Sequence, residues 1–203
     1  MAAITDIAEL EAIYGEPAQA AIIKVTDHIT PTYRRFIEAS PFMALATVGP
    51  QGLDCSPRGD RGNVVTCVDN KTLMLPDRRG NNRMDCLRNI ISDPRISLMF
   101  LVPGSNTVLR VNGRAIVTAD KDICARFETE GKLPRSVIAI DVQEVYFQCA
   151  RAVMRADLWN PEAHVDAKTL PTPGEMLSDA SGGKVSSTDY DSNWPQRAAK
   201  TLW

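Results

Sequence analysis

The stretch FMALATVGPQG, residues 42–52, decides the fold class. Its first seven residues form an apolar run of strand length, and Gly-Pro-Gln-Gly then signals a turn. An extended continuation follows at residues 53–56, and β-rich stretches recur at 64–68, 72–75, 96–102, 107–118 and 137–149. Only two or three helical patterns separate them, too few for alternating βαβ units. The sequence therefore predicts a mainly β fold with peripheral helices, a six-stranded antiparallel barrel.

Local patterns refine this prediction. Residues 83–91 carry apolar side chains at helical spacing, and Asn82 is a candidate N-cap for that helix. A second helix is expected within residues 120–129. Gly113 interrupts the long strand 107–118, which predicts a β-bulge there.

The segments before and after the strands differ in character. Residues 1–40 are expected to form a helical segment, and residues 41–150 hold the strands. Residues 151–203 form a tail in which proline and glycine interrupt any regular element. The tail nevertheless contains all three tryptophans of the chain, which are Trp159, Trp194 and Trp203. A disordered tail would seldom hold them all, so we expect it to pack on the barrel or on a partner subunit.

The composition is that of an ordinary globular chain. Of the 203 residues, 44% are hydrophobic and 24% are charged, and the net charge is -2. This balance gives no reason to expect nucleic acid or an acidic membrane as a general partner, so an anion site must be a local cluster of cations. No apolar window is long enough to span a membrane, and residues 1–11 lack the basic start of a secretory signal. We therefore expect a cytoplasmic protein.

The five cysteines indicate neither a disulfide framework nor a metal site. Their number is odd, no Cys-x-x-Cys pair occurs, and His28 and His164 are the two histidines of the chain. We expect reduced and mostly buried thiols, with Cys149 as a buried thiol and not a nucleophile. Trp159 is interpreted as a packing residue.

Two basic, glycine-containing loops carry the strongest functional signal. They are SPRGDRG at residues 56–62 and PDRRGNNR at residues 76–83, and the second runs into the predicted helix. Several N–H donors and one or two guanidinium groups together bind a phosphate monoester, and a helix N-terminus offers free N–H groups. The two loops therefore predict a phosphate site.

The hairpin between the two loops would bring them together in space. The candidate phosphate contacts are then Ser56, Arg58, Asn82 and Arg83. In the alternative interpretation, the arginines are solvated or pair with the nearby acids Asp60, Asp77 and Asp85.

A third feature lies in the strand 107–118. Arg110 and Asn112 share one face of this strand, while Leu109 and Val111 share the other. The polar pair belongs either to an ordinary exposed strand face or to a ligand pocket or subunit contact.

The motifs follow one another in a recognisable order. They are SPRGD at residues 56–60, PDR at 76–78, NNR at 81–83, DPR at 93–95 and LRVNG at 109–113. This order resembles the pyridoxamine 5′-phosphate oxidase-like superfamily of FMN-binding split barrels, in particular its bacterial branch of FMN-dependent enzymes with unknown substrates. The resemblance covers residues 41–161. It implies a split β-barrel and a homodimer with two FMN sites at the subunit interface.

The resemblance also implies which residues hold the cofactor. In the family, basic and hydroxyl side chains of the second and third strands and of the following helix hold the FMN phosphate. The matching positions for the phosphate are Ser56, Arg58, Asn82 and Arg83, and the further candidate cofactor residues are Asp77, Asn81 and Arg110. Arg110 and Asn112 lie in the strand that approaches the flavin of the other subunit. No catalytic acid or base is assigned.

Two departures from the family pattern argue against vitamin B6 oxidation. The Arg-Leu-His-Asp-Arg-like segment that binds the substrate phosphate in the true oxidases has no counterpart after residue 137, and Met84 follows Arg83 where those enzymes carry Lys. The expected function is an FMN-dependent oxidoreductase with an unknown small-molecule substrate or electron donor. The alternatives are a non-catalytic flavin carrier and a split barrel that uses the deazaflavin F420. Haem is disfavoured because both histidines lie outside the predicted barrel core.

Overall fold

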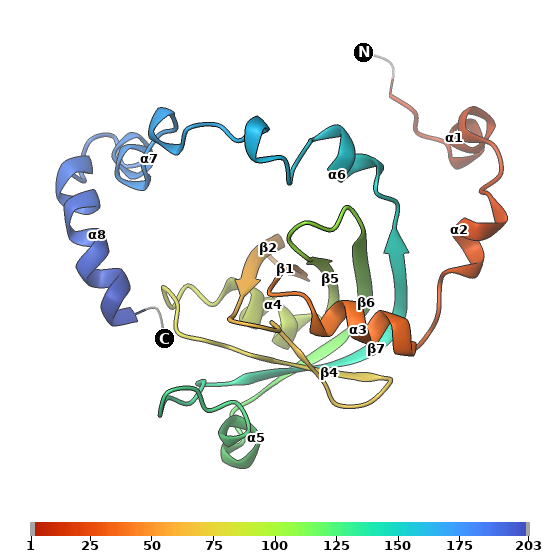
Figure 1. Ribbon diagram of the computed structural model, residues 1–203, viewed down its shortest axis with the longest axis horizontal. Helices are drawn as coiled ribbons and strands as arrows, with labels where there is room; N and C mark the ends of the chain where they lie inside the picture. Colours follow the sequence, from red (N-terminus) through yellow and green to blue (C-terminus); the bar gives the residue numbers. More distant parts are fainter. Residues whose placement is uncertain (1–2, 202–203) are drawn as a thin grey trace.

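The computed structural model describes residues 3–201 of the chain. Seven strands form one sheet in the order β2-β1-β5-β6-β7-β4-β3, and every pair of neighbours is antiparallel (Figure 1). The strands are β1 Phe42–Gly49, β2 Gly52–Gly59, β3 Thr66–Cys67, β4 Thr72–Pro76, β5 Arg95–Leu101, β6 Val108–Thr118 and β7 Val137–Gln148. Because β2 and β3 are the two ends of this order, the sheet is open.

The predicted mainly β class is confirmed, but the sheet has seven strands where the sequence predicted six. The difference arises at residues 52–59, which pair with β1 along their whole length and form a full strand. The expected strand at residues 64–68 is reduced to the two residues of β3. The first residues of the expected strand do not pair with β4, and the Val64 amide donates instead to the Ser40 carbonyl at 3.0 Å.

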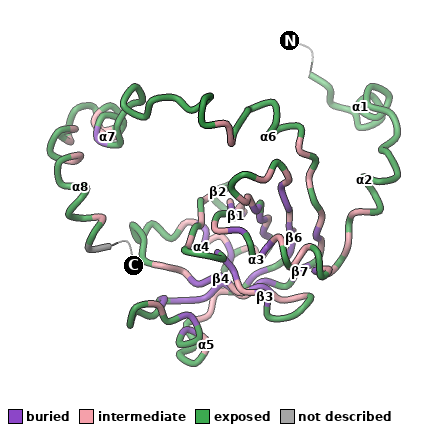
Figure 2. Tube along the Cα trace, in the orientation of Figure 1, coloured by how far each residue is buried: buried purple, intermediate pink, exposed green. Residues whose placement is uncertain are grey.

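The core lies inside the curved sheet (Figure 2). Alternate residues of the central strands point into it, so the buried side chains follow the two-residue period of a strand. They include Met43 and Leu45 of β1, Leu98 and Phe100 of β5, and Leu109 and Val111 of β6. The expected alternation of Leu109 and Val111 against Arg110 and Asn112 is confirmed.

The helices lie around this sheet. They are α1 Ile7–Tyr14, α2 Gln19–Ile23, α3 Pro31–Glu38, α4 Asp85–Ser92, α5 Lys121–Ala125, α6 Arg151–Arg155, α7 Pro173–Ala180 and α8 Ser187–Thr201, with two short 3-10 turns at Pro161–Ala163 and Ala167–Thr169. Helix α4 packs on β1, where Asn89 Nδ2 donates to Thr47 Oγ1 at 3.1 Å. Within the part of the chain that the structure describes, no helix is long and apolar enough to cross a membrane.

Helix α4 begins later than predicted. Its first residue is Asp85 and its N-cap position is Met84, so the prediction of Asn82 as the N-cap is wrong. Asn82 and Met84 both adopt left-handed backbone angles, with φ of 61° and 60°. These angles keep the chain out of the helix until Asp85.

The predicted bulge is present in β6. The register between β6 and β7 shifts between Asn112 and Gly113. A Cβ atom at Gly113 would lie 2.2 Å from the Asp141 carbonyl oxygen of β7. Glycine is therefore required here by the close approach of two backbones.

The tail contains more regular structure than the sequence predicted. Helix α8 runs for 15 residues, and α7 begins with a capping box formed by Thr172 and Glu175. The Asp191 side chain joins the two helices, because it accepts from Thr172 Oγ1 at 2.6 Å and from the Gly174 amide at 2.9 Å. The expectation that proline and glycine interrupt every regular element of the tail is therefore wrong, since α8 continues through Pro195.

The tail leaves the barrel after β7 and arcs around one side of it (Figure 1). Its start is fixed to the barrel, since Trp159 Nε1 donates to the Ser105 carbonyl at 2.7 Å. Trp203 lies outside the described residues. Packing of the remaining tail on a partner subunit stays a prediction.

Candidate functional site

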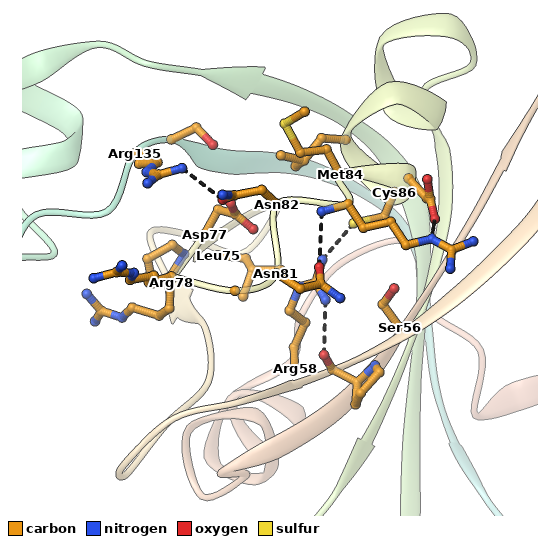
Figure 3. A pocket seen from close by; sticks show the side chains of 18 of the residues that line it. Ser56, Arg58, Leu75, Asp77, Arg78, Asn81, Asn82, Met84, Cys86 and Arg135 are labelled. Carbon is orange, nitrogen blue, oxygen red and sulfur yellow. Dashed lines mark hydrogen bonds and ion pairs between the residues drawn. The ribbon is translucent and has the colours of Figure 1, made fainter. Parts of the chain in front are cut away.

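A cavity of about 650 Å³ opens between the two basic loops. Its lining comes from β2, from the end of β4 and the loop that follows, from the start of α4, and from the residues just before β7 (Figure 3). The structure brings six of the seven predicted cofactor residues to this cavity, namely Ser56, Arg58, Asp77, Asn81, Asn82 and Arg83. Arg110 does not line it.

Strand pairing places these loops. Strand β4 ends at Pro76, which pairs with Val137 at the start of β7. The Asp77 amide donates to the Ser136 carbonyl at 2.9 Å, which ties the loop after β4 to the segment before β7. Strand pairing and this hydrogen bond together fix one wall of the cavity.

Arg58 is the least satisfied polar side chain in the cavity. Its Nη1 donates to the Pro57 carbonyl at 3.0 Å and its Nη2 approaches Cys86 Sγ at 2.6 Å, while its Nε is buried without a hydrogen-bond partner (Figure 3). A thiol is a weak acceptor, so this contact satisfies a guanidinium poorly. Burial raises the pKa of Cys86, which keeps the thiol neutral beside the arginine. Arg58 therefore brings to the cavity lining a positively charged guanidinium whose hydrogen bonds are incomplete.

Two other arginines of the cavity are already paired. Arg83 Nε pairs with Asp85, and the Arg83 side chain is 79% exposed. Arg78 Nε lies 3.0 Å from Asp60 Oδ2, and its Nη1 donates to the Phe127 carbonyl at 2.7 Å. The alternative interpretation, that these arginines pair with local acids, thus holds for Arg78 and Arg83 but not for Arg58.

The remaining predicted residues have identifiable local partners. Ser56 Oγ donates to Asp54 Oδ2 at 2.8 Å, so in this conformation its hydroxyl proton points to a carboxylate. Asn81 Oδ1 accepts from the Arg83 amide at 3.0 Å, which shapes the loop. Burial raises the pKa of Asp77, and the positive charges of Arg58 and Arg135 act in the opposite direction.

Arg135 is a cavity residue that the sequence argument missed. Its Nη1 donates to Asn82 Oδ1 at 2.9 Å, and no carboxylate among the described residues bonds to it (Figure 3). The motif Pro-Arg-Ser directly before the last strand was a signal that could have been used. Using it required the knowledge that β7 pairs with β4, which brings residue 135 beside the loop after β4.

Arg110 lies on the opposite, outer face of the sheet. Its guanidinium carbon is 5.1 Å from the centre of the Tyr146 ring of β7. Asn112, on the same face, donates to Glu144. Within one chain the structure does not bring this pair to the cavity.

The cysteines differ sharply in environment. Cys67, Cys86 and Cys124 are buried, but Cys149 is exposed, so the prediction of a buried Cys149 is wrong. It follows the last residue of β7, at the point where the chain leaves the sheet. A hydrogen bond from the Arg151 backbone, together with the charges of Arg151 and Lys24, lowers the pKa of Cys149. Burial raises the pKa of Cys67 to about 11. No group of three possible metal ligands occurs among the described residues.

This contrast predicts selective alkylation. Iodoacetamide added to the native protein near neutral pH should modify Cys149 at least about tenfold faster than Cys67 or Cys86, because the thiolate is the reactive form and burial blocks access. Peptide mass spectrometry over time measures the three rates, and the urea-unfolded chain is the control in which they should converge. Equal rates in the native protein would contradict the described environments.

The fold and the cavity define a class of protein. An open antiparallel sheet around a main hydrophobic core, with the cavity at the ends of β2 and β4, is the architecture of a split-barrel domain. A family model described as pyridoxamine 5′-phosphate oxidase matches residues 29–149, more than half of the chain. The chain therefore belongs to this family. No curated protein matches it.

Several solved structures are similar to this chain at low sequence identity. A single-residue variant of HupZ from Group A Streptococcus superposes with a TM-score of 0.50 at 18% identity, covering 59% of this chain and 99% of that chain. A candidate pyridoxamine 5′-phosphate oxidase from Lactobacillus delbrueckii has a TM-score of 0.49 and 22% identity, covering 60% of this chain and 95% of the other. General Stress Protein 26 from Bacillus anthracis has a TM-score of 0.42 and 14% identity over 56% of this chain and 88% of the other.

Proposed function

We propose that this protein binds FMN in the described cavity, through the flavin phosphate, and acts as a flavin-dependent oxidoreductase on a small molecule. One observation carries the proposal: Arg58 lines the cavity with a guanidinium that forms no ion pair with a carboxylate and whose buried Nε has no hydrogen-bond partner. A bound phosphoryl group would neutralise this guanidinium, since charge-assisted hydrogen bonds to guanidinium are strong. Membership of the pyridoxamine 5′-phosphate oxidase family supports the same ligand.

The cavity is compatible with a flavin. Its volume of about 650 Å³ lies within the range of ordinary cofactor sites. Its lining combines the cations with apolar side chains suited to a ring system, among them Val64, Leu75, Met84 and Leu87. When bound, FMN would supply the hydride or electron transfer. In this proposal the protein's own residues hold the phosphate and orient the ring.

The residues have distinct roles. Arg58 contacts the phosphate directly, and Arg135 contributes a second unpaired positive charge from across the cavity. Asn82 positions Arg135 through its side-chain oxygen. Asp77, whose pKa burial raises, lies between these cations and limits their net charge. Nothing in the cavity identifies a catalytic acid or base.

Arg83 should matter less than Arg58. Because it is exposed and paired with Asp85, Arg83→Ala should weaken FMN binding by no more than about 1 kcal/mol, the scale of an exposed ion pair. Isothermal titration calorimetry with the wild type and Arg83→Ala measures the change. A larger loss than that of Arg58→Ala would show that Arg83 leaves Asp85 to become the principal phosphate contact.

A homodimer is part of the same proposal. The outer face of the sheet carries exposed apolar side chains next to small ones, with Phe42 and Met99 each 42% exposed and Ala44 between them. Arg110 faces Met99 in the register of β5 and β6 and lies on this outer face. A second copy seated here would bury the apolar residues and carry Arg110 toward a neighbouring flavin site.

The dimer is tested by light scattering coupled to gel filtration. The expected mass is twice the 22.3 kDa of the chain. Met99→Asp should give a monomer with weakened FMN binding, because it places a charge in the apolar contact. A wild-type monomer that binds FMN fully would contradict the shared site.

The function is tested on the purified full-length chain. We expect flavin absorbance in the visible spectrum, or saturable binding of added FMN in the micromolar range, and flavin-dependent oxidation of NADH or NADPH. Absence of flavin binding contradicts the proposal. Binding without turnover would favour a flavin carrier, and a deazaflavin spectrum would replace FMN by F420.

A further inference from the structure

A second, smaller cavity of about 300 Å³ adjoins the proposed flavin site. The two cavities share the side chains of Arg78, Arg79 and Arg135. The lining of the smaller cavity, here called the cationic annex, consists of Arg78, Arg79, Thr129, Lys132, Leu133, Pro134 and Arg135. It thus holds four cations and no carboxylate.

Three of the four cations lack a bonded acid. Arg78 is paired with Asp60, but Arg135 donates to the neutral amide of Asn82. Among the described residues, Arg79 and Lys132 form no hydrogen bond or ion pair through their side chains. Like charges gathered around a partly enclosed space repel one another, and a bound anion relieves that repulsion.

The annex is held in shape by its own backbone. Thr129 and Lys132 exchange two backbone hydrogen bonds of 3.0 Å around the turn Glu130–Gly131, whose φ angles are 51° and 74°. Two left-handed residues in succession are typical of a tight type I′ hairpin turn. Glu130, the acid of that turn, pairs with Arg61 at 3.4 Å and does not line the annex.

The opposite wall is equally fixed. Arg78 is anchored to the Phe127 carbonyl, and the Asp77 amide to the Ser136 carbonyl. In both walls, hydrogen bonds therefore hold in place the backbone that carries the cationic side chains.

We propose that the annex binds an anionic group, a phosphoryl or carboxylate oxyanion, of a small-molecule substrate that is held alongside the cofactor. The inference rests on the proposed function for the occupant of the main cavity and extends it by naming the class of substrate. The shared arginines connect the two cavities, so a substrate anchored in the annex reaches the flavin site. Lys132, which lines the annex and not the main cavity, binds this anion without contacting the cofactor phosphate, which is assigned to Arg58.

Calorimetry with inorganic pyrophosphate as the probe tests the annex. The wild type should bind pyrophosphate both without flavin and when saturated with FMN. Lys132 lines the annex and not the main cavity, so Lys132→Ala should bind pyrophosphate at least about fivefold more weakly, because a charge-assisted contact is lost. FMN affinity should change less than about threefold in the same variant. The matched control is Lys168→Ala, which removes one exposed cation that lines neither cavity and should leave both affinities unchanged.

The outcomes separate this inference from the flavin proposal. Unchanged pyrophosphate affinity in the annex variant, or strict competition between pyrophosphate and FMN, overturns the annex as a substrate subsite. If FMN fails to bind at all while the annex variant still loses pyrophosphate, the anion site stands and the flavin proposal falls.

Discussion

Arg58→Ala is expected to weaken FMN binding by about 1.5–3 kcal/mol, roughly 10- to 150-fold in the dissociation constant. The reason is the environment of this side chain. Its Nε is buried and unbonded, its nearest partner is the neutral thiol of Cys86, and no carboxylate pairs with it. The substitution removes the cation that is proposed to bind the phosphoryl group directly. Fluorescence quenching of FMN by the purified variant measures the change.

The control for this experiment is Arg155→Ala. Arg155 lies in the last turn of α6, is exposed, and does not line either cavity described above. It reports the effect of removing one positive charge from the chain without touching the site. Circular dichroism of Arg58→Ala confirms that the fold is retained. Equal affinities of Arg58→Ala and Arg155→Ala for FMN would remove Arg58 from the phosphate site.

Phe100→Ala is expected to lower the free energy of unfolding by about 3–5 kcal/mol. Phe100 lies in β5 between Met43 of β1 and Leu109 of β6 in the sheet register, and it is among the largest fully buried side chains of the core. Truncation leaves a cavity that the paired strands cannot close, because backbone hydrogen bonds fix their spacing. Urea unfolding followed by circular dichroism measures the loss.

A smaller truncation provides the comparison. Phe100→Leu keeps most of the buried volume and should cost about 1–2 kcal/mol. The ratio of the two losses in unfolding free energy distinguishes a packing effect at Phe100 from a general destabilisation of β5. If Phe100→Ala unfolds at the wild-type urea concentration, Phe100 is not part of the core that the structure describes.

Much of the barrel could be predicted because its signals are local. The apolar run at residues 42–48 and the alternation at Leu109 and Val111 report which side chains point inward, and the two-residue period converts directly into strand faces. Gly113 could be placed at a bulge for a similar reason, since a glycine inside a strand marks a close approach of backbones. The seventh strand was missed because residues 57–59 contain proline, arginine and glycine, which suggest a loop. Pairing with β1 overrides that tendency.

The site was less predictable because it depends on pairing between distant strands. Arg135 reaches the cavity through the contact of β4 with β7, about sixty residues apart in sequence, and the local Pro-Arg-Ser motif does not by itself indicate that contact. Asn82 looked like a helix cap from its residue type. In the structure its side chain bonds Arg135 and its backbone is left-handed. Likewise, the burial of Arg58 beside the Cys86 thiol depends on tertiary contacts. The position of Arg58 in a basic loop, in contrast, could be predicted from the sequence.

The central claim is that this cavity recognises a phosphoryl group on a flavin, and titration of the wild-type chain with FMN and with riboflavin tests it most directly. The two ligands share the ring system and differ in the phosphate alone. FMN should bind saturably, and riboflavin at least about tenfold more weakly, because it has no group to meet Arg58. Equal affinities for the two ligands, or no binding of either, would contradict the assignment.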